Sequence, residues 1–274
     1  MNLKMIAVDM DGTFLNDEST YDRERFLKDY EQLKEKGIHF VVASGNPYIQ
    51  LQGSFGEEAS ELTYIAENGA YVVDQGKELF LASISKQNVK QIIEELYQHK
   101  DVLCWVCTKN QSYALSSMPE QYFQSFLPYF PGIKKVERYE DIQEDILKFA
   151  LFLPNGNVEE RLETFSSIVD EEVYVIDSGH DCVDIVHKNA NKGYAMELLI
   201  EHFNIEKEDV IAFGNAMNDA LMLQKSGIGY AMANSNEAFK EMFDHIAPSN
   251  NEDGVLHVIE ESMKKVHFYS ELFS

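Results

Sequence analysis

The segment "MIAVDMDGTFLND", Met5 to Asp17, decides the fold because it joins a buried strand to a pair of acidic residues. Its first four residues are apolar, and a short apolar run of this kind is typical of a strand buried on both faces. Asp9 and Asp11 follow directly. Two carboxylates at the end of a buried strand repel each other and lose hydration, so we expect a compensating cation beside them.

Two further apolar runs also end in short polar clusters. Residues 38–42 lead into "ASGN", residues 43–46, and residues 208–213 lead into "GNAMND", residues 214–219. A helical pattern separates the first two strands, so strand, helix and strand form a βαβ unit with a parallel sheet. Such sheets bind ligands beyond the carboxyl ends of their strands, so the three clusters are expected to meet at one edge.

The middle of the chain has a different rhythm. After an Asn-Gly pair at residues 68–69 that predicts a hairpin turn, amphipathic helices alternate with pairs of strands over residues 83–186, and one of these helices is expected over residues 119–130. Adjacent strands pair as hairpins, which predicts an α+β module with an antiparallel sheet. The first pattern then returns, so a parallel α/β core, residues 1–82 and 187–274, is predicted to be split by this insert.

The composition excludes several classes of partner. The chain has 274 residues, 47 acidic and 23 basic, with a formal net charge of −24. Such a surface repels nucleic acid and anionic membranes, so neither is expected as a partner. No apolar run approaches the roughly 20 residues that a membrane helix needs. A small anionic substrate would need a metal ion or precisely placed cations.

The cysteines and the first residues indicate the compartment. Cys104 and Cys107 form a C-x-x-C pair on a predicted strand, where residues three apart face opposite ways. No second pair completes a zinc site. The first residues lack the pattern of a signal peptide. We therefore expect packed thiols and a reducing cytoplasm.

The acidic cluster predicts a hard metal site. Two acids at the first strand and one at the third suit Mg²⁺, which prefers oxygen ligands and keeps several waters. An EF-hand loop is excluded because Gly12 is the fourth residue from Asp9 rather than the sixth. Two alternatives remain for "DMDGT" alone: a turn capped by aspartate, and the D-x-D metal-nucleotide site of glycosyltransferases.

Four motifs together resemble the haloacid-dehalogenase superfamily of phosphatases. They are "DMDGT", "ASGN", "NKG" (residues 191–193) and "GNAMND". Their order and the large insert after the second resemble the Cof-type sugar phosphatases. The resemblance implies a Rossmann-like parallel-sheet core with an α+β cap domain, residues 83–186. It also implies a Mg²⁺-dependent phosphatase that hydrolyses small phosphate monoesters, above all sugar phosphates, through an aspartyl phosphate.

The resemblance assigns a role to each motif. Asp9 would be the nucleophile, and Asp11 the general acid and base. The phosphoryl group would be held by the residues Met10 (through nearby backbone N–H groups), Ser44, Gly45, Lys192 and Asn218. Mg²⁺ would be held by Asp9, Asp11 (through its backbone carbonyl), Asn215 and Asp219. Lys188 competes with Lys192 for the phosphate-neutralising role, but the spacing of Lys192 fits the helix better.

Two departures from the family pattern affect the expected function. Asn215 stands where most relatives have an aspartate that binds Mg²⁺, and Asn46 stands where many have arginine. A neutral ligand in place of a charged one weakens metal binding. The alternative function is therefore a protein that binds phosphorylated metabolites with weak or no turnover. The expected partner is a small phosphorylated metabolite; the oligomeric state, monomer or weak dimer, stays open.

Overall fold

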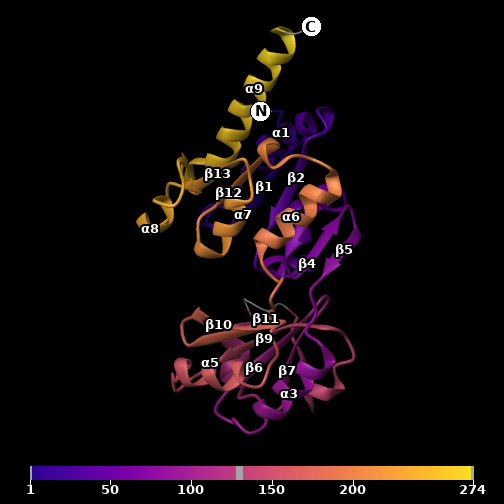
Figure 1. The fold of residues 1–274 in the computed structure, drawn as a ribbon, viewed down its shortest axis with the longest axis vertical. Coiled ribbons are helices and arrows are strands. Elements are labelled where there is room, and N and C mark those ends of the chain that lie inside the picture. The colour runs from indigo at the N-terminus through magenta and orange to yellow at the C-terminus, as the bar shows by residue number, and fades with distance from the viewer. Residues whose placement is uncertain (1, 128–131, 273–274) are drawn as a thin grey trace. The chain divides into compact units, whose positions relative to one another are not determined.

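The structure, a computed structural model, describes residues 2–127 and 132–272. Within them the strands form two sheets (Figure 1), an eight-stranded one ordered β14-β13-β12-β1-β2-β3-β4-β5 and a six-stranded one ordered β10-β11-β9-β6-β7-β8. The chain divides into two compact units. The core unit comprises residues 1–45, 51–79 and 191–274, and the inserted unit comprises residues 46–50 and 80–190.

The eight-stranded sheet is parallel from β14 to β3, and β4 is antiparallel to β3. Its strands are β1 (Met5–Asp9), β2 (His39–Ala43), β3 (Thr63–Ala66), β4 (Tyr71–Asp74), β5 (Lys77–Leu81), β12 (Val210–Gly214), β13 (Ile228–Met232) and β14 (His245–Ala247). The helices that alternate with them are α1 (Arg23–Glu35), α2 (Tyr48–Phe55), α6 (Lys192–Phe203), α7 (Ala220–Gln224), α8 (Glu237–Lys240) and α9 (Gly254–Leu272). In Figure 1, α6 and α7 lie against each other in front of this sheet.

β1 lies in the middle of the sheet, between β2 and β12. Every residue of β1 and of β12 is buried, as expected for strands with helices on both faces. Asp9 is level with Ala43, and Val8 is level with Phe213. The polar clusters that follow these three strands therefore leave the sheet at the same edge, as the sequence predicts.

The inserted unit is an α+β module, so the predicted mixed fold class is confirmed. Its elements are α3 (Lys86–Leu96), β6 (Leu103–Thr108), β7 (Ser112–Leu115), α4 (Glu120–Phe126), β8 (Lys134–Val136), β9 (Ile146–Phe152), α5 (Val158–Ser166), β10 (Val173–Gly179) and β11 (Cys182–His187). Its strand pairs are antiparallel except for β7 and β8, which are parallel. Of the helix expected over residues 119–130, the structure has α4 between Pro119 at its N-cap and Leu127 at its C-cap, and residues 128–130 lie outside the described residues.

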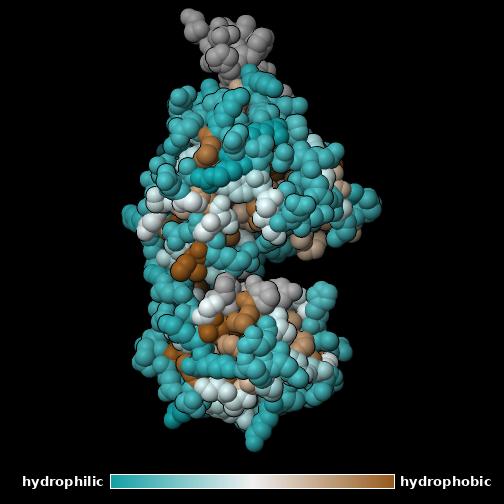
Figure 2. Space-filling model, turned by 180° about the vertical axis from the view of Figure 1, so that it is seen from behind, coloured by the Kyte–Doolittle hydropathy of each residue, from teal (hydrophilic) through white to brown (hydrophobic). Residues whose placement is uncertain are grey.

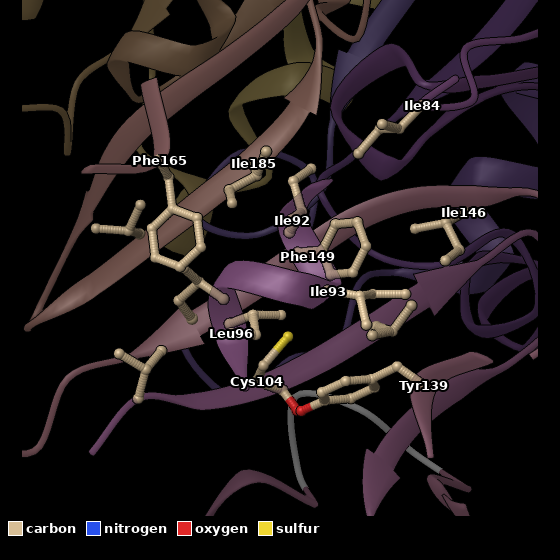
Figure 3. Close-up of a cluster of buried hydrophobic side chains, with 14 of the residues drawn as sticks. Ile84, Ile92, Ile93, Leu96, Cys104, Tyr139, Ile146, Phe149, Phe165 and Ile185 are labelled. Carbon is tan, nitrogen blue, oxygen red and sulfur yellow. The ribbon is translucent and has the colours of Figure 1, made fainter. Parts of the chain in front are cut away.

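Each face of the six-stranded sheet has its own apolar cluster. On one face Phe149, Phe165 and Ile185 gather around Ile92 of α3 (Figure 3), and all four are fully buried. On the other face Trp105 of β6 stacks on a phenylalanine of α4, with ring centroids 4.2 Å apart. These two clusters give the inserted unit a hydrophobic core of its own.

Figure 2 shows teal, hydrophilic side chains over most of the visible face of each unit. None of the three cysteines forms a disulfide. Across residues 2–127 and 132–272, no helix is long and apolar enough to cross a membrane.

One buried acid lies where α1 and α9 pack together. Asp29 of α1 is 2% exposed, and within the described part of the chain its Oδ2 has no hydrogen-bond partner. Burial, followed by the charge of Glu260 on α9, raises the pKa of Asp29 to about 6. The ionised carboxylate is therefore less stable in the folded chain than in the unfolded chain.

This burial makes stability depend on pH. Because the folded pKa of Asp29 lies above its unfolded value, ionisation opposes folding, and stability is lost as pH rises from about 4 to about 6. We expect Asp29→Asn to remove this loss. The variant should gain about 1 to 2 kcal/mol on wild type between pH 4 and pH 7, measured by urea unfolding. Asp244→Asn, at an exposed position, is the control; a variant that tracks wild type at every pH would contradict the account.

Candidate active site

Lys192 joins three of the four motifs at the edge of the sheet. Its Nζ lies 2.6 Å from Oδ1 of Asp9 and 2.6 Å from Oδ1 of Asp219. Asp9 ends β1, Lys192 is the first residue of α6, and Asp219 precedes α7. Lys192 is 1% exposed and Asp219 is fully buried, so this charged group is almost without solvent.

The two carboxylates and the ammonium stabilise one another. Burial raises the pKa of Asp9 to about 6, against the lowering effect of Lys192. Burial also opposes the charge of Lys192, but Asp9 and Asp219 outweigh it and raise the lysine's pKa. Lys192 therefore stays protonated near neutral pH, and Asp9 is mostly ionised there.

Asp219 also shapes the loop that contains it. Its Oδ2 accepts hydrogen bonds from the backbone N–H groups of Asn215 at 3.0 Å and Ala216 at 3.1 Å. A Cβ on Gly214 would lie 2.4 Å from the Cβ of Asp219, so only glycine permits this approach. One carboxylate oxygen of Asp219 thus contacts Lys192, and the other contacts the loop.

The loop after β1 folds back over its own start. The N–H of Phe14 donates to the carbonyl oxygens of Asp9 and Met10, and the N–H of Leu15 donates to that of Met10 at 2.9 Å. Gly12 has a φ of +74°, and a Cβ there would lie 2.3 Å from Nδ2 of Asn215. The side chain of Asn215 therefore lies directly against this loop. Asp11 is exposed, in contrast to the buried Asp9.

The second motif meets the fourth through Asn68. The N–H of Asn68 donates to the carbonyl oxygen of Ser44 at 2.9 Å, and its Oδ1 accepts from Nδ2 of Asn218 at 3.1 Å. Its amide lies 3.2 Å from the place that a Cβ on Gly45 would take. Asn68 has a φ of 55°, a conformation that asparagine tolerates better than most residues.

The sequence pattern predicts a hairpin turn at Asn68 but not its contacts with the second and fourth motifs. The turn is present between β3 and β4. One feature of the sequence could have predicted these contacts. Asn68 directly follows β3, and β3 is the parallel strand next to β2 in the sheet. Of the two candidate lysines, Lys192 contacts Asp9, whereas Lys188 lies in the inserted unit and pairs with Glu172 at 2.6 Å.

These motifs lie within a region that matches one known family. Residues 6–259 match the family model described as haloacid dehalogenase-like hydrolase. The chain belongs to this family. The resemblance of the four motifs to the haloacid-dehalogenase superfamily is confirmed, and so is the prediction that the protein is a phosphatase.

Similar proteins in this family are named phosphatases. The chain is 34% identical over 264 residues to the 5-amino-6-(5-phospho-D-ribitylamino)uracil phosphatase YbjI of Escherichia coli (strain K12), covering 96% of this chain and 97% of that protein. YcsE of Bacillus subtilis (strain 168), a phosphatase of the same name, is 25% identical over 94% of this chain and 95% of its own. The solved structure of SMU.1108c from Streptococcus mutans UA159 has a TM-score of 0.84 at 30% identity, covering 96% of this chain and 99% of that one.

The donors at this edge fit a Mg²⁺ ion that keeps several of its waters. The Asp9 carboxylate, the Asn215 amide and the backbone carbonyl of Asp11 are oxygen ligands, the kind that Mg²⁺ takes. Among the described residues, no three acidic, histidine or cysteine side chains form a metal cage. Such a cage is not required, because proteins commonly hold Mg²⁺ through one or two carboxylates. Asp219, the fourth residue predicted to bind Mg²⁺, uses its two carboxylate oxygens in contacts with Lys192 and the loop.

Because of these contacts, we predict that replacing the carboxylate of Asp219 by an amide lowers the stability of the protein strongly. Asp219→Asn removes one of the two charges that offset the buried ammonium, and breaking a buried ion pair costs about 3 kcal/mol or more. We expect a loss of this size in the free energy of unfolding at pH 7, measured in urea with a chelator present. Asp244→Asn should change stability by less than about 0.5 kcal/mol. Equal stability of both variants would show that the carboxylate of Asp219 is dispensable.

Proposed function

We propose that the protein is a Mg²⁺-dependent phosphatase that hydrolyses small phosphate monoesters through an aspartyl phosphate on Asp9. The observation that carries this proposal is the buried Asp9 carboxylate held by Lys192, which in turn is held by Asp219. A carboxylate with a fixed orientation and a neighbouring cation is suited to attack phosphorus. Covalent catalysis divides one difficult displacement into two easier ones.

Asp9 is positioned for this role by the sheet and by Lys192. β1 fixes its backbone, and Lys192 contacts its Oδ1. Burial raises the pKa of Asp9, so its carboxylate is a stronger base than that of an exposed aspartate. Mg²⁺, when bound, would supply positive charge to the phosphoryl oxygens and offset the repulsion between them and Asp9.

The remaining residues of the edge hold the phosphoryl group in this proposal. The hydroxyl of Ser44 and the backbone N–H groups of Gly45 and of the loop at Met10 are donors, and Asn218 is held beside them by Asn68. Lys192 neutralises negative charge that develops on the phosphoryl group during the transfer. On a chain with a net charge of −24, one placed cation matters more than on a neutral protein.

Asp11 is the general acid and base of the proposed reaction. It protonates the leaving oxygen in the first step and removes a proton from water in the second. It lies two residues from Asp9 and is exposed, so it can face an incoming substrate while Asp9 stays buried. The two carboxyl groups therefore differ in their exposure to solvent.

We infer that the substrate is a phosphate ester of a primary alcohol on a sugar or sugar alcohol. Support comes from the E. coli and B. subtilis relatives, whose names specify the 5-phospho-D-ribitylamino group. We further propose that the inserted unit acts as the cap that reads the leaving group. A cytoplasmic enzyme acting on small metabolites also fits the acidic composition, which disfavours nucleic acid.

Phosphate release from a substrate panel tests the proposal. The panel is 5-amino-6-(5-phospho-D-ribitylamino)uracil with several sugar phosphates, each with Mg²⁺ or a chelator. We expect Mg²⁺-dependent release that falls at least about 10³-fold in Asp9→Asn, because the nucleophile is lost. Asp244→Asn should retain wild-type release.

Two other outcomes would contradict the proposal. Release that survives in Asp9→Asn would exclude the aspartyl phosphate. Saturable binding of an ester with no release would favour the alternative of a phosphometabolite-binding protein, with Asn215 as the reason for weak metal binding.

A further inference from the structure

Two loops of the core unit hold the segment that contains Asp11. Asn234 follows β13, and its Nδ2 donates to the carbonyl oxygen of Gly12 at 2.8 Å. Asn250 follows β14, and its Nδ2 donates to the carbonyl oxygen of Leu15 at 3.0 Å. These contacts bind residues 12–15 to loops more than 200 residues later in the chain.

A third asparagine holds the end of the same segment. Nδ2 of Asn251 donates to Oδ2 of Asp17 at 2.9 Å, and Oδ1 of Asn251 accepts from the N–H of Asp17 at 3.0 Å. Asn250 also donates to Oδ1 of Asp17 at 3.1 Å. These hydrogen bonds, first that of Asn251 and then that of Asn250, lower the pKa of Asp17. Asp17 therefore stays ionised and keeps both donors at neutral pH.

The three asparagines, Asn234, Asn250 and Asn251, form one connected clasp. The N–H of Asn250 donates to Oδ1 of Asn234 at 3.2 Å, so the two loops are joined. Asn250 is 2% exposed and is the first residue of a short 3₁₀ turn. Ser249 and Glu252 close that turn with a capping box. The clasp is thus anchored on its far side as well.

Asp9 and Asp11 consequently depend on different supports. Asp9 is fixed by β1 and by Lys192. Asp11 lies beyond the strand, in a loop whose following residues are held by the clasp and whose shape brings Leu15 back to Asp11. A small displacement of this loop would move Asp11 and leave Asp9 in place.

We propose that the clasp is a positioning device for Asp11, and that it acts on proton transfer to the leaving group rather than on the attack by Asp9. The inference rests on the proposed phosphatase function. A proton donor must lie within hydrogen-bond reach of the leaving oxygen, so a loose loop reduces its effect. An ester whose leaving group needs no proton is insensitive to that displacement.

Two substrates that differ in leaving group separate the two roles. The leaving group of a sugar phosphate is an alkoxide, which requires a proton, whereas that of p-nitrophenyl phosphate is p-nitrophenolate, which is stable without one. The quantity to compare is kcat/KM, because it reports the steps up to the first phosphoryl transfer. The variants are Asn234→Ala and Asn250→Ala, with Asp11→Asn as the reference for a lost general acid.

The control is Asn236→Ala, which removes the N-cap of α8 without touching residues 12–17. It reproduces a local loss of stability near the clasp, because an N-cap deletion weakens the helix. Asn234 is exposed, so its variant is expected to fold even if the buried Asn250→Ala does not.

The expected result is an asymmetric loss. General acid catalysis contributes about 10²- to 10⁴-fold, so clasp variants should lose about 10-fold or more on the sugar phosphate and less than about 3-fold on p-nitrophenyl phosphate. Asp11→Asn should show the same asymmetry with a larger loss, and Asn236→Ala should show none. The sugar-phosphate loss should persist at saturating Mg²⁺.

Other outcomes identify which idea fails. Equal losses on both substrates, or no loss on either, would overturn the positioning role while wild-type and Asp11→Asn rates leave the phosphatase intact. Wild-type protein with no release from either ester would instead overturn the proposed function, and the inference with it.

Discussion

The core unit depends on two buried ion pairs, which the ammonium group of Lys192 forms with Asp9 and Asp219. Either carboxylate, buried without the lysine, would carry a desolvation cost without compensation. The lysine offsets both, and it does so only if three segments separated by almost the whole chain come together. The site and the fold therefore stabilise each other, because these three charged groups also fix the positions of β1, α6 and the loop before α7.

The parallel sheet is what brings these segments together. β1, β2 and β12 are neighbours in register, so their polar ends emerge side by side. Close approach there requires glycine at two points, beside Asp219 at Gly214 and beside Asn215 at Gly12. β1 and Lys192 hold Asp9, whereas Asp11 lies on the loop after the strand, which contacts the loops after β13 and β14. This division suits a reaction in which one carboxylate attacks and the other transfers protons.

Much of this arrangement could be predicted from the sequence. Apolar runs ending in Asp9, Ser44 and Gly214 indicate strand ends at one edge, because the rule for parallel sheets depends only on chain direction. Side-chain partners are a different matter, since they depend on loop conformations. Asn68 looked like an ordinary turn residue, and nothing near Asn234 or Asn250 in sequence reveals a contact with residues 12–17. The contacts of Asp219 with Lys192 and two N–H groups were likewise hidden, although Asp219 itself was identified.

The most direct test of the central claim is the site of covalent phosphorylation. Asp11→Asn protein is mixed with p-nitrophenyl phosphate and Mg²⁺, quenched in acid, digested and analysed by mass spectrometry; this variant should form the aspartyl phosphate but hydrolyse it slowly. The account predicts one added phosphoryl group on the peptide that contains Asp9, and none when Asp9 is also replaced by asparagine. A phosphoryl group on another residue, or turnover with no labelled peptide, would contradict it.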